Sequence, residues 1–197
     1  ATPNNRPTAP AGEYANPVLP GFYPDPSITK KGDDYYLTTS SFSYTPGLPI
    51  LRSKNLTDWE LVGYALDREE QMEFSGARIS RGIFAPTIRY HDGLFYIITT
   101  SVDNGGNFII TASDPAGPWS EPIWLPEVGG IDPDIFFDDD GRTYLVHHRN
   151  PAVQKTPDHT ALWVMEVDPE TFAPLSEDIM VVDGAAPAPW HTEYIEG

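Results

Sequence analysis

The sequence of 197 residues contains no cysteine and little positive charge, with 12 lysines and arginines against 29 aspartates and glutamates and a formal charge of -17. Without cysteine, no disulfide indicates the compartment in which the protein works. The shortage of positive charge disfavours phosphate backbones and anionic lipid surfaces, because such a chain is repelled by both. We therefore expect neither a nucleic-acid nor a membrane partner, and a neutral ligand is easier to accommodate.

Long apolar stretches are also missing. No run approaches the roughly 20 residues that span a bilayer, and no charged and then apolar signal segment opens the chain. We expect a soluble protein from which any export signal has been removed. Residues 1–15 are predicted to be a linker or extended segment of the kind that exported enzymes carry, and Asn55-Leu56-Thr57 is a glycosylation sequon. These two features predict an extracellular, secreted protein.

Proline, glycine and short apolar runs are abundant instead. The 21 prolines and 16 glycines are scattered along the chain without a collagen-like period. This distribution favours many short elements joined by turns, and it fits helix-rich folds poorly. The content of 40% hydrophobic and 12% aromatic residues is enough for one sizeable core. We expect a folded protein with little helix.

One pattern is repeated in three parts of the chain, in "PDPSI" with "GDDYYLTTS", in "FAPTI" with "HDGLFYIITTS" and in "IDPDI" with "DDDGRTYLVHH". Each copy ends in a strand whose aromatic residue is Tyr36, Tyr96 or Tyr144. The later strands repeat as well, because Ser53 precedes Trp59 by the same interval as Ser113 precedes Trp119. Four short antiparallel strands at a period of about 50 to 60 residues are typical of a β-propeller blade. The sequence therefore predicts an all-β fold in which residues 16–197 form a partial propeller of about three blades.

The acidic residues of the repeat share one position. Asp25, Asp132 and Glu196 occupy it in successive units, and Ala85 occupies it in the second. Equivalent positions of propeller blades point toward the central axis, so these carboxylates are expected to converge. Gathered carboxylates repel one another and raise at least one pKa, which suits acid–base chemistry. The alternatives to a catalytic role for Asp25 and Asp132 are capped turns or a structural cation site. The prolines on either side of Asp25 stiffen its backbone and are expected to hold its side chain at the axial end of the strand.

Other side chains in the repeats have structural interpretations. The alternating tyrosines and tryptophans are expected to pack one blade on the next. The acidic run at 138–140 is expected to be a solvated turn. His147 and His148 alternate faces of one strand and cannot both reach the axis, so neither is expected to bind a metal. His91 is expected to be a solvated turn residue.

The quoted motifs resemble glycoside hydrolase family 43. The resemblance rests on "NPVLPGFYPDPSI", "FAPTIRYHDGLFYI", "GIDPDIFFDDDGRTYLV" and the final "EG", and it covers roughly residues 16–197. It implies a five-bladed propeller that hydrolyses pentose glycosides with inversion, as a β-xylosidase or an α-L-arabinofuranosidase. It also implies that Asp25 is the general base and that Glu196 is the general acid. Asp132 would be the aspartate that tunes the pKa of the acid and orients it. Glu193 is the rival acid, but it lacks the following glycine and lies outside the repeated position.

Two features depart from the family pattern. Phe84 stands where the family often has tryptophan, so the platform for the sugar is expected to be smaller or to lie elsewhere; Phe42, Tyr44 and Phe84 are our candidates for the pocket walls. The sequence also stops where a fourth blade is expected to begin. We therefore expect a fragment, a nicked product or one chain of a split protein, poorly stable and inactive until a second polypeptide or a C-terminal segment completes the propeller.

The resemblance also bears on substrate and cofactor. The expected substrate is plant cell-wall xylan, arabinoxylan or arabinan, or an oligosaccharide of these. No cofactor is expected to be required, and a structural calcium ion on the axis would take its ligands from outside this chain. An endo-arabinanase on the same scaffold is the enzymatic alternative. A glycan-binding propeller module without catalysis is the other, although such a module would be expected to repeat a binding motif on each blade.

Overall fold

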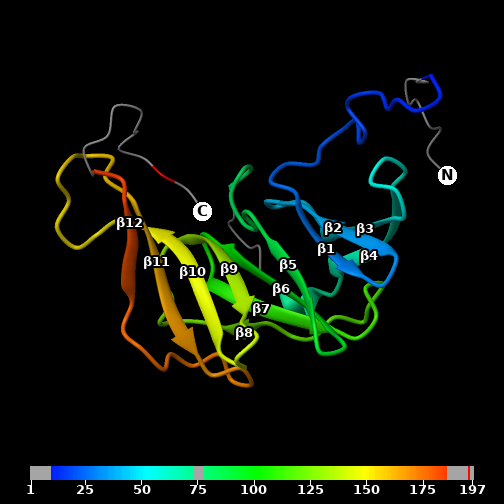
Figure 1. Cartoon of the computed structure of the whole chain (residues 1–197). Coiled ribbons are helices and arrows are strands. Elements are labelled where there is room, and N and C mark those ends of the chain that lie inside the picture. The colour runs from blue at the N-terminus through cyan, green and yellow to red at the C-terminus, as the bar shows by residue number, and fades with distance from the viewer. Residues whose placement is uncertain (1–9, 73–77, 186–194, 196–197) are drawn as a thin grey trace.

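The computed structural model describes residues 10–72, 78–185 and Ile195. In this part of the chain, 12 strands form three antiparallel sheets of four strands each, which follow one another along the sequence (Figure 1). The first sheet contains β1 (Ser27–Lys31), β2 (Asp34–Thr38), β3 (Gly47–Ser53) and β4 (Glu60–Leu66), followed by the short 3-10 helix η1 (Glu69–Gln71). The second contains β5 (Thr87–His91), β6 (Leu94–Ser101), β7 (Gly106–Ala112) and β8 (Ile123–Trp124). The third contains β9 (Ile131–Phe137), β10 (Thr143–Arg149), β11 (Ala161–Val167) and β12 (Ile179–Asp183).

Each sheet is a meander whose strands pair in chain order, which is the arrangement of a propeller blade. The first strands lie together, because β5 packs on β1 and on β9. The prediction of three four-stranded units is confirmed, including the last two strands of the third unit. No helix in the described residues is long and apolar enough to cross a membrane.

Local sequence explains the tight hairpins that begin the blades. β5 and β6 are joined through Asp92 and Gly93, whose φ angles are 46° and 88°. Positive φ at both central residues is typical of the type I′ turn, whose twist matches that of the flanking strands. The turn at 138–140 lies between β9 and β10 and is largely exposed, as predicted.

Two apolar layers separate the three sheets, and β6 contributes to both because its side chains alternate between faces. Phe95 and Ile97 lie in the layer against the first sheet, whereas Ile98 lies in the layer against the third. Tyr36 packs edge-on against Phe95 with ring centroids 5.0 Å apart, and Tyr96 packs on Phe137. These tyrosines therefore pack between blades, as the repeat predicted.

The outward faces of the first and third sheets carry exposed apolar side chains. Ile28 and Leu61 belong to the first sheet, and Phe136, Ile179 and Val182 belong to the third. Pairing places Val182 and Ile179 beside residues of β11 that alternate with the core-facing ones. Both ends of the arc thus present apolar sheet surface, as expected of blades that have no further blade against them.

The histidines are placed as follows. His147 and His148 are both buried on β10, and His147 Nε2 lies 3.0 Å from Asp178 Oδ1. His91 is the last residue of β5, beside the turn; its side chain is 41% exposed, as expected, and one face of its ring stacks on Phe137 with centroids 4.2 Å apart and planes 2° apart. The imidazole therefore covers an aromatic face at the blade interface, while part of the side chain stays exposed to solvent.

Candidate active site

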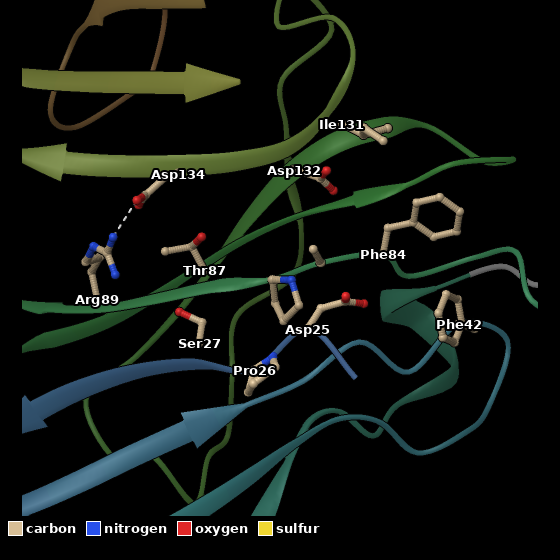
Figure 2. A pocket seen from close by; sticks show the side chains of 12 residues that line it. Asp25, Pro26, Ser27, Phe42, Phe84, Thr87, Arg89, Ile131, Asp132 and Asp134 are labelled. Atoms are coloured by element: carbon tan, nitrogen blue, oxygen red, sulfur yellow. Dashed lines mark hydrogen bonds and ion pairs between the residues drawn. The ribbon is translucent and has the colours of Figure 1, made fainter. Parts of the chain in front are cut away.

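The first strands of the three blades surround a pocket with a volume of about 590 Å³ (Figure 2). Every copy of the repeat contributes to it through the shared position and its neighbours. Asp25 and Asp132 therefore line one cavity. Ala85, which occupies the shared position of the second blade, lines it too. The lining residues are Asp25, Pro26, Ser27, Phe42, Phe84, Ala85, Pro86, Thr87, Arg89, Ile131, Asp132 and Asp134.

Asp25 is fixed by its backbone and by one hydrogen bond. Its φ of 51° lies in the left-handed region, where aspartate is among the few residues found besides glycine. The Ser40 amide donates to Pro24 O at 3.0 Å, which ties this turn to the end of β2. The buried Ser40 hydroxyl donates to Asp25 Oδ2 at 2.5 Å. One carboxylate oxygen is thus oriented while the residue stays exposed to the pocket.

Asp132 has nearly the same backbone conformation, with a φ of 52°. It lies at an irregularity of the β9–β10 pairing, where the register shifts between Val146 and His148. Bulges of this kind re-aim a side chain, and here Asp132 is directed into the pocket with 14% of its side chain exposed. His148 Nδ1 lies 4.0 Å from Asp132 Oδ2.

A glycine permits this approach of β9 to β10. Gly130 has a φ of 81°, and a Cβ added there would lie 2.0 Å from the backbone oxygen of His148. No side chain fits at that distance, so the glycine before "IDP" is needed for Asp132 to sit where it does.

Farther along the same strands, an ion pair joins the second and third blades. Arg89 Nη2 of β5 donates to Asp134 Oδ2 of β9, as the dashed line in Figure 2 marks. Burial raises the pKa of Asp134, and the attraction of the Arg89 guanidinium opposes this only in part. Figure 2 shows this pair toward one end of the pocket and the two phenylalanines toward the other, with Asp25 and Asp132 between them.

Comparison with known protein families identifies the family to which this site belongs. The family model for glycosyl hydrolases family 43 matches residues 14–197. The chain belongs to glycoside hydrolase family 43.

Curated relatives agree with this assignment. A xylosidase/arabinosidase of Butyrivibrio fibrisolvens is 55% identical over 173 residues, which cover 86% of this chain and 33% of the relative. A non-reducing end α-L-arabinofuranosidase of Bacteroides ovatus is 45% identical over 165 residues, which cover 80% of this chain and 29% of the relative. The family 43 chain thus spans about a third of the length of the curated relatives it matches.

Solved structures agree as well. The crystal structure of a GH43_12 protein retrieved from the capybara gut metagenome superposes with a TM-score of 0.81 at 44% identity, over 85% of this chain and 32% of that one. The three sheets therefore match the five-bladed family 43 propeller over about a third of its length. The predicted fold class is confirmed.

Two of the three aromatic candidates line the pocket of this family 43 chain. Phe42 and Phe84 contact each other edge to face, with centroids 5.7 Å apart and planes at 79°. Phe42 exchanges backbone hydrogen bonds with Ile83 at 2.9 and 3.0 Å, so loops of two blades are tied together beside the pocket. Tyr44 is not among the lining residues: it is 60% exposed and packs on Phe22, which in turn contacts Phe42.

The other sequence predictions at this site concern the acid and the metal. Glu196 and Glu193 lie outside the described residues. Within residues 10–72, 78–185 and 195, no group of three or more His, Asp and Glu side chains is suited to hold a metal ion. The calcium ion on the axis, with ligands from outside this chain, stays a prediction.

Sequence reasoning did not identify Ser40, His148, Arg89 or Asp134 as site residues. A signal for the first two exists, because Ser40 and His148 follow the repeat's aromatic by the same interval, and each contacts the shared-position acid of its own blade. Asp134 lies two residues after Asp132 in the same copy of the repeat, and both line the pocket.

Proposed function

We propose that this chain, within a complete family 43 domain, hydrolyses pentose glycosides of xylan, arabinoxylan or arabinan with inversion, as a β-xylosidase or an α-L-arabinofuranosidase. By complete domain we mean this chain together with the remaining blades of the propeller. The observation that carries the proposal is the meeting of Asp25 and Asp132 in one pocket of about 590 Å³ with two phenylalanines on its wall. The names of the relatives from Butyrivibrio fibrisolvens and Bacteroides ovatus support the sugar class.

Asp25 is the general base in this proposal. It takes a proton from a water molecule, whose oxygen bonds to the anomeric carbon as the glycosidic C–O bond breaks. The Ser40 hydroxyl engages Oδ2 and thereby fixes the plane of the carboxylate. A base must lie within hydrogen-bond reach of the proton it removes, so a fixed plane favours one position of the attacking water.

Glu196 is the general acid and gives its proton to the leaving oxygen. Inversion requires the acid and the base to stand roughly 6.5–9.5 Å apart, so that the water fits between base and sugar. A negative Asp132 near the acid would keep Glu196 protonated by repulsion between like charges. Asp132 is suited to this role because its bulge and Gly130 hold it in the pocket in a single direction.

Phe42 and Phe84 are proposed as the walls that pack against the sugar. Pentose rings are neutral and present C–H groups, so apolar burial contributes to their binding without involving the negative charge of the chain. Tyr44, outside the lining, is proposed to act only through Phe22 and Phe42.

The complete domain is proposed to include strands beyond those described here. Two observations support this. The outer faces of the first and third sheets are apolar, at Ile28 and Leu61 and at Ile179 and Val182, and the chain spans only about a third of the length of its relatives. A C-terminal segment or a second polypeptide would supply the remaining blades, together with the ligands for a structural calcium ion. We also propose that the protein is secreted and that the reaction needs no cofactor.

The experiment is an assay of the complete domain on nitrophenyl β-xylosides and α-L-arabinofuranosides, on xylo-oligosaccharides and on linear arabinan. Release of single pentoses, with the inverted anomer seen first by proton NMR, is the expected result. Oligomeric products from arabinan would instead favour an endo-arabinanase, and binding without hydrolysis would favour a glycan-binding module. Retention of configuration, or full activity of Asp25→Ala, would refute the mechanism.

A further inference from the structure

A buried threonine outside the pocket holds the residue that precedes Glu196. Thr160 is 2% exposed and follows the loop between β10 and β11. Its hydroxyl donates to Ile195 O at 2.9 Å and accepts from Ile195 N–H at 2.7 Å. One side chain therefore satisfies both backbone polar groups of Ile195, and Ile195 is bonded directly to Glu196 in the sequence.

Thr160 is itself held by hydrogen bonds around the buried His159. Gly184 N–H donates to Thr160 O at 3.1 Å. The adjacent His159 accepts from Lys155 N–H at Nδ1, so its own proton lies on Nε2 and is donated to Asp183 Oδ1 at 2.6 Å. Lys155 Nζ donates to Asp183 Oδ2 at 2.5 Å. Thr160 is thus held both by the backbone of Gly184 and by the hydrogen bonds of its neighbour His159.

Asp183 keeps its negative charge over the working pH range. The hydrogen bond from Lys155 is the largest cause that lowers the pKa of Asp183 to about 2. Asp183 is therefore ionised at any pH at which a glycosidase of this kind would be assayed.

The contact also lies next to the pocket. Thr160 lines a second cavity, with a volume of about 420 Å³, together with Ile131 and His148. Ile131 lines the active-site pocket too, and His148 is the residue 4.0 Å from Asp132. The anchored backbone of Ile195 is therefore on the Asp132 side of the site.

We propose that Thr160 is a positioning residue for the general acid. By fixing the N–H and C=O of Ile195, it fixes where the backbone enters Glu196, and with it the distance from the acid to the leaving oxygen. The inference rests on the proposed function, in which Glu196 is the acid. Thr160 does not touch the sugar and acts only through the backbone of Ile195.

The test compares two leaving groups in the complete domain. Thr160→Val keeps the shape of the side chain but removes both hydrogen bonds, whereas Thr160→Ser keeps the hydroxyl. General acid catalysis contributes about 10²–10⁴-fold, so a displaced acid should slow kcat on xylobiose or an arabino-oligosaccharide by about 10- to 100-fold. A nitrophenyl glycoside, whose phenolate leaves without a proton, should slow by less than about 3-fold. Thr160→Ser should restore the rate on both substrates.

Thr38→Val is the matched control. Thr38 is buried on β2, and its hydroxyl has no hydrogen-bond partner in the part of the chain that the structure describes. Loss of this hydroxyl should leave the ratio of the two rates unchanged. Should Thr160→Val fail to fold by circular dichroism, Thr160→Cys retains the side-chain size with weaker hydrogen bonds, and a smaller contrast in the same direction is expected.

Glu196→Gln, assayed in parallel, separates this inference from the proposed function. A Glu196→Gln protein without the contrast would refute the acid itself. Suppose instead that Glu196→Gln slows the natural glycoside more than the nitrophenyl glycoside. Thr160→Val and Thr160→Cys proteins that slow both substrates equally, or slow neither, would then overturn only the role of Thr160.

Discussion

Replacing Ser40 by alanine removes the hydroxyl that donates to Asp25 Oδ2 at 2.5 Å. Hydrogen bonds to charged groups are worth about 1.5–3 kcal/mol, and the lower end applies because Asp25 is exposed and water can replace the hydroxyl. If that free energy is lost in the transition state, about 1.4 kcal/mol corresponds to a tenfold lower rate. We therefore expect Ser40→Ala to lower kcat/KM by about tenfold.

The loss should be equal on a natural glycoside and on a nitrophenyl glycoside, because Ser40 orients the base and does not assist the leaving group. The assay is kcat/KM on both substrates with the complete domain. Ser101→Ala is the matched control, since Ser101 is buried and its hydroxyl has no hydrogen-bond partner within the described residues. An unchanged rate in Ser40→Ala, or a loss confined to the natural glycoside, would refute the reasoning.

Three further predictions concern the pocket walls, Gly130 and the Arg89–Asp134 ion pair. Phe84→Ala should raise KM for a nitrophenyl pentoside by about 2- to 10-fold, whereas Tyr44→Ala should leave it unchanged; equal effects would contradict the pocket lining. Gly141→Ala, at a φ of 85° with open space around it, should cost about 1–2 kcal/mol of unfolding free energy in urea titrations. Gly130→Ala should cost clearly more, because its Cβ would meet backbone at 2.0 Å, and similar costs would show that β9 moves aside. Asp134→Asn should raise Tm near neutral pH, and the gain should vanish as pH falls below the ordinary range of aspartate: a raised pKa means that ionisation of Asp134 weakens the fold as pH rises through that pKa. A Tm gain that persists in acid would point to a cause other than charge.

The repeat made most of the fold predictable. Strand pairing between neighbours in the chain depends on alternation and on turn residues such as Asp92 and Gly93, which are local signals. The shared position of Asp25 and Asp132 was enough to place both in one pocket, because blades repeat their geometry about an axis.

Contacts that depend on register or on side-chain direction could not be predicted. The Arg89–Asp134 pair joins two blades, and its geometry depends on how those blades are offset. The sequence predicts that His91 is solvated, but it does not predict that its ring stacks on Phe137, because Phe137 comes from another blade. Tyr44 is near Phe42 in the sequence, yet its loop turns the ring onto Phe22, outside the lining.

β5 packs on both β1 and β9, yet the shared position of its blade carries only Ala85. The blade that contributes no acid is therefore the spacer between Asp25 and Asp132, and its two apolar interfaces set the gap across which a sugar must fit. Small shifts at either interface would change that gap without touching a catalytic group. Variation in the core around Phe95 and Ile98 is thus a route by which related chains could come to prefer sugars of different size while keeping the same acids.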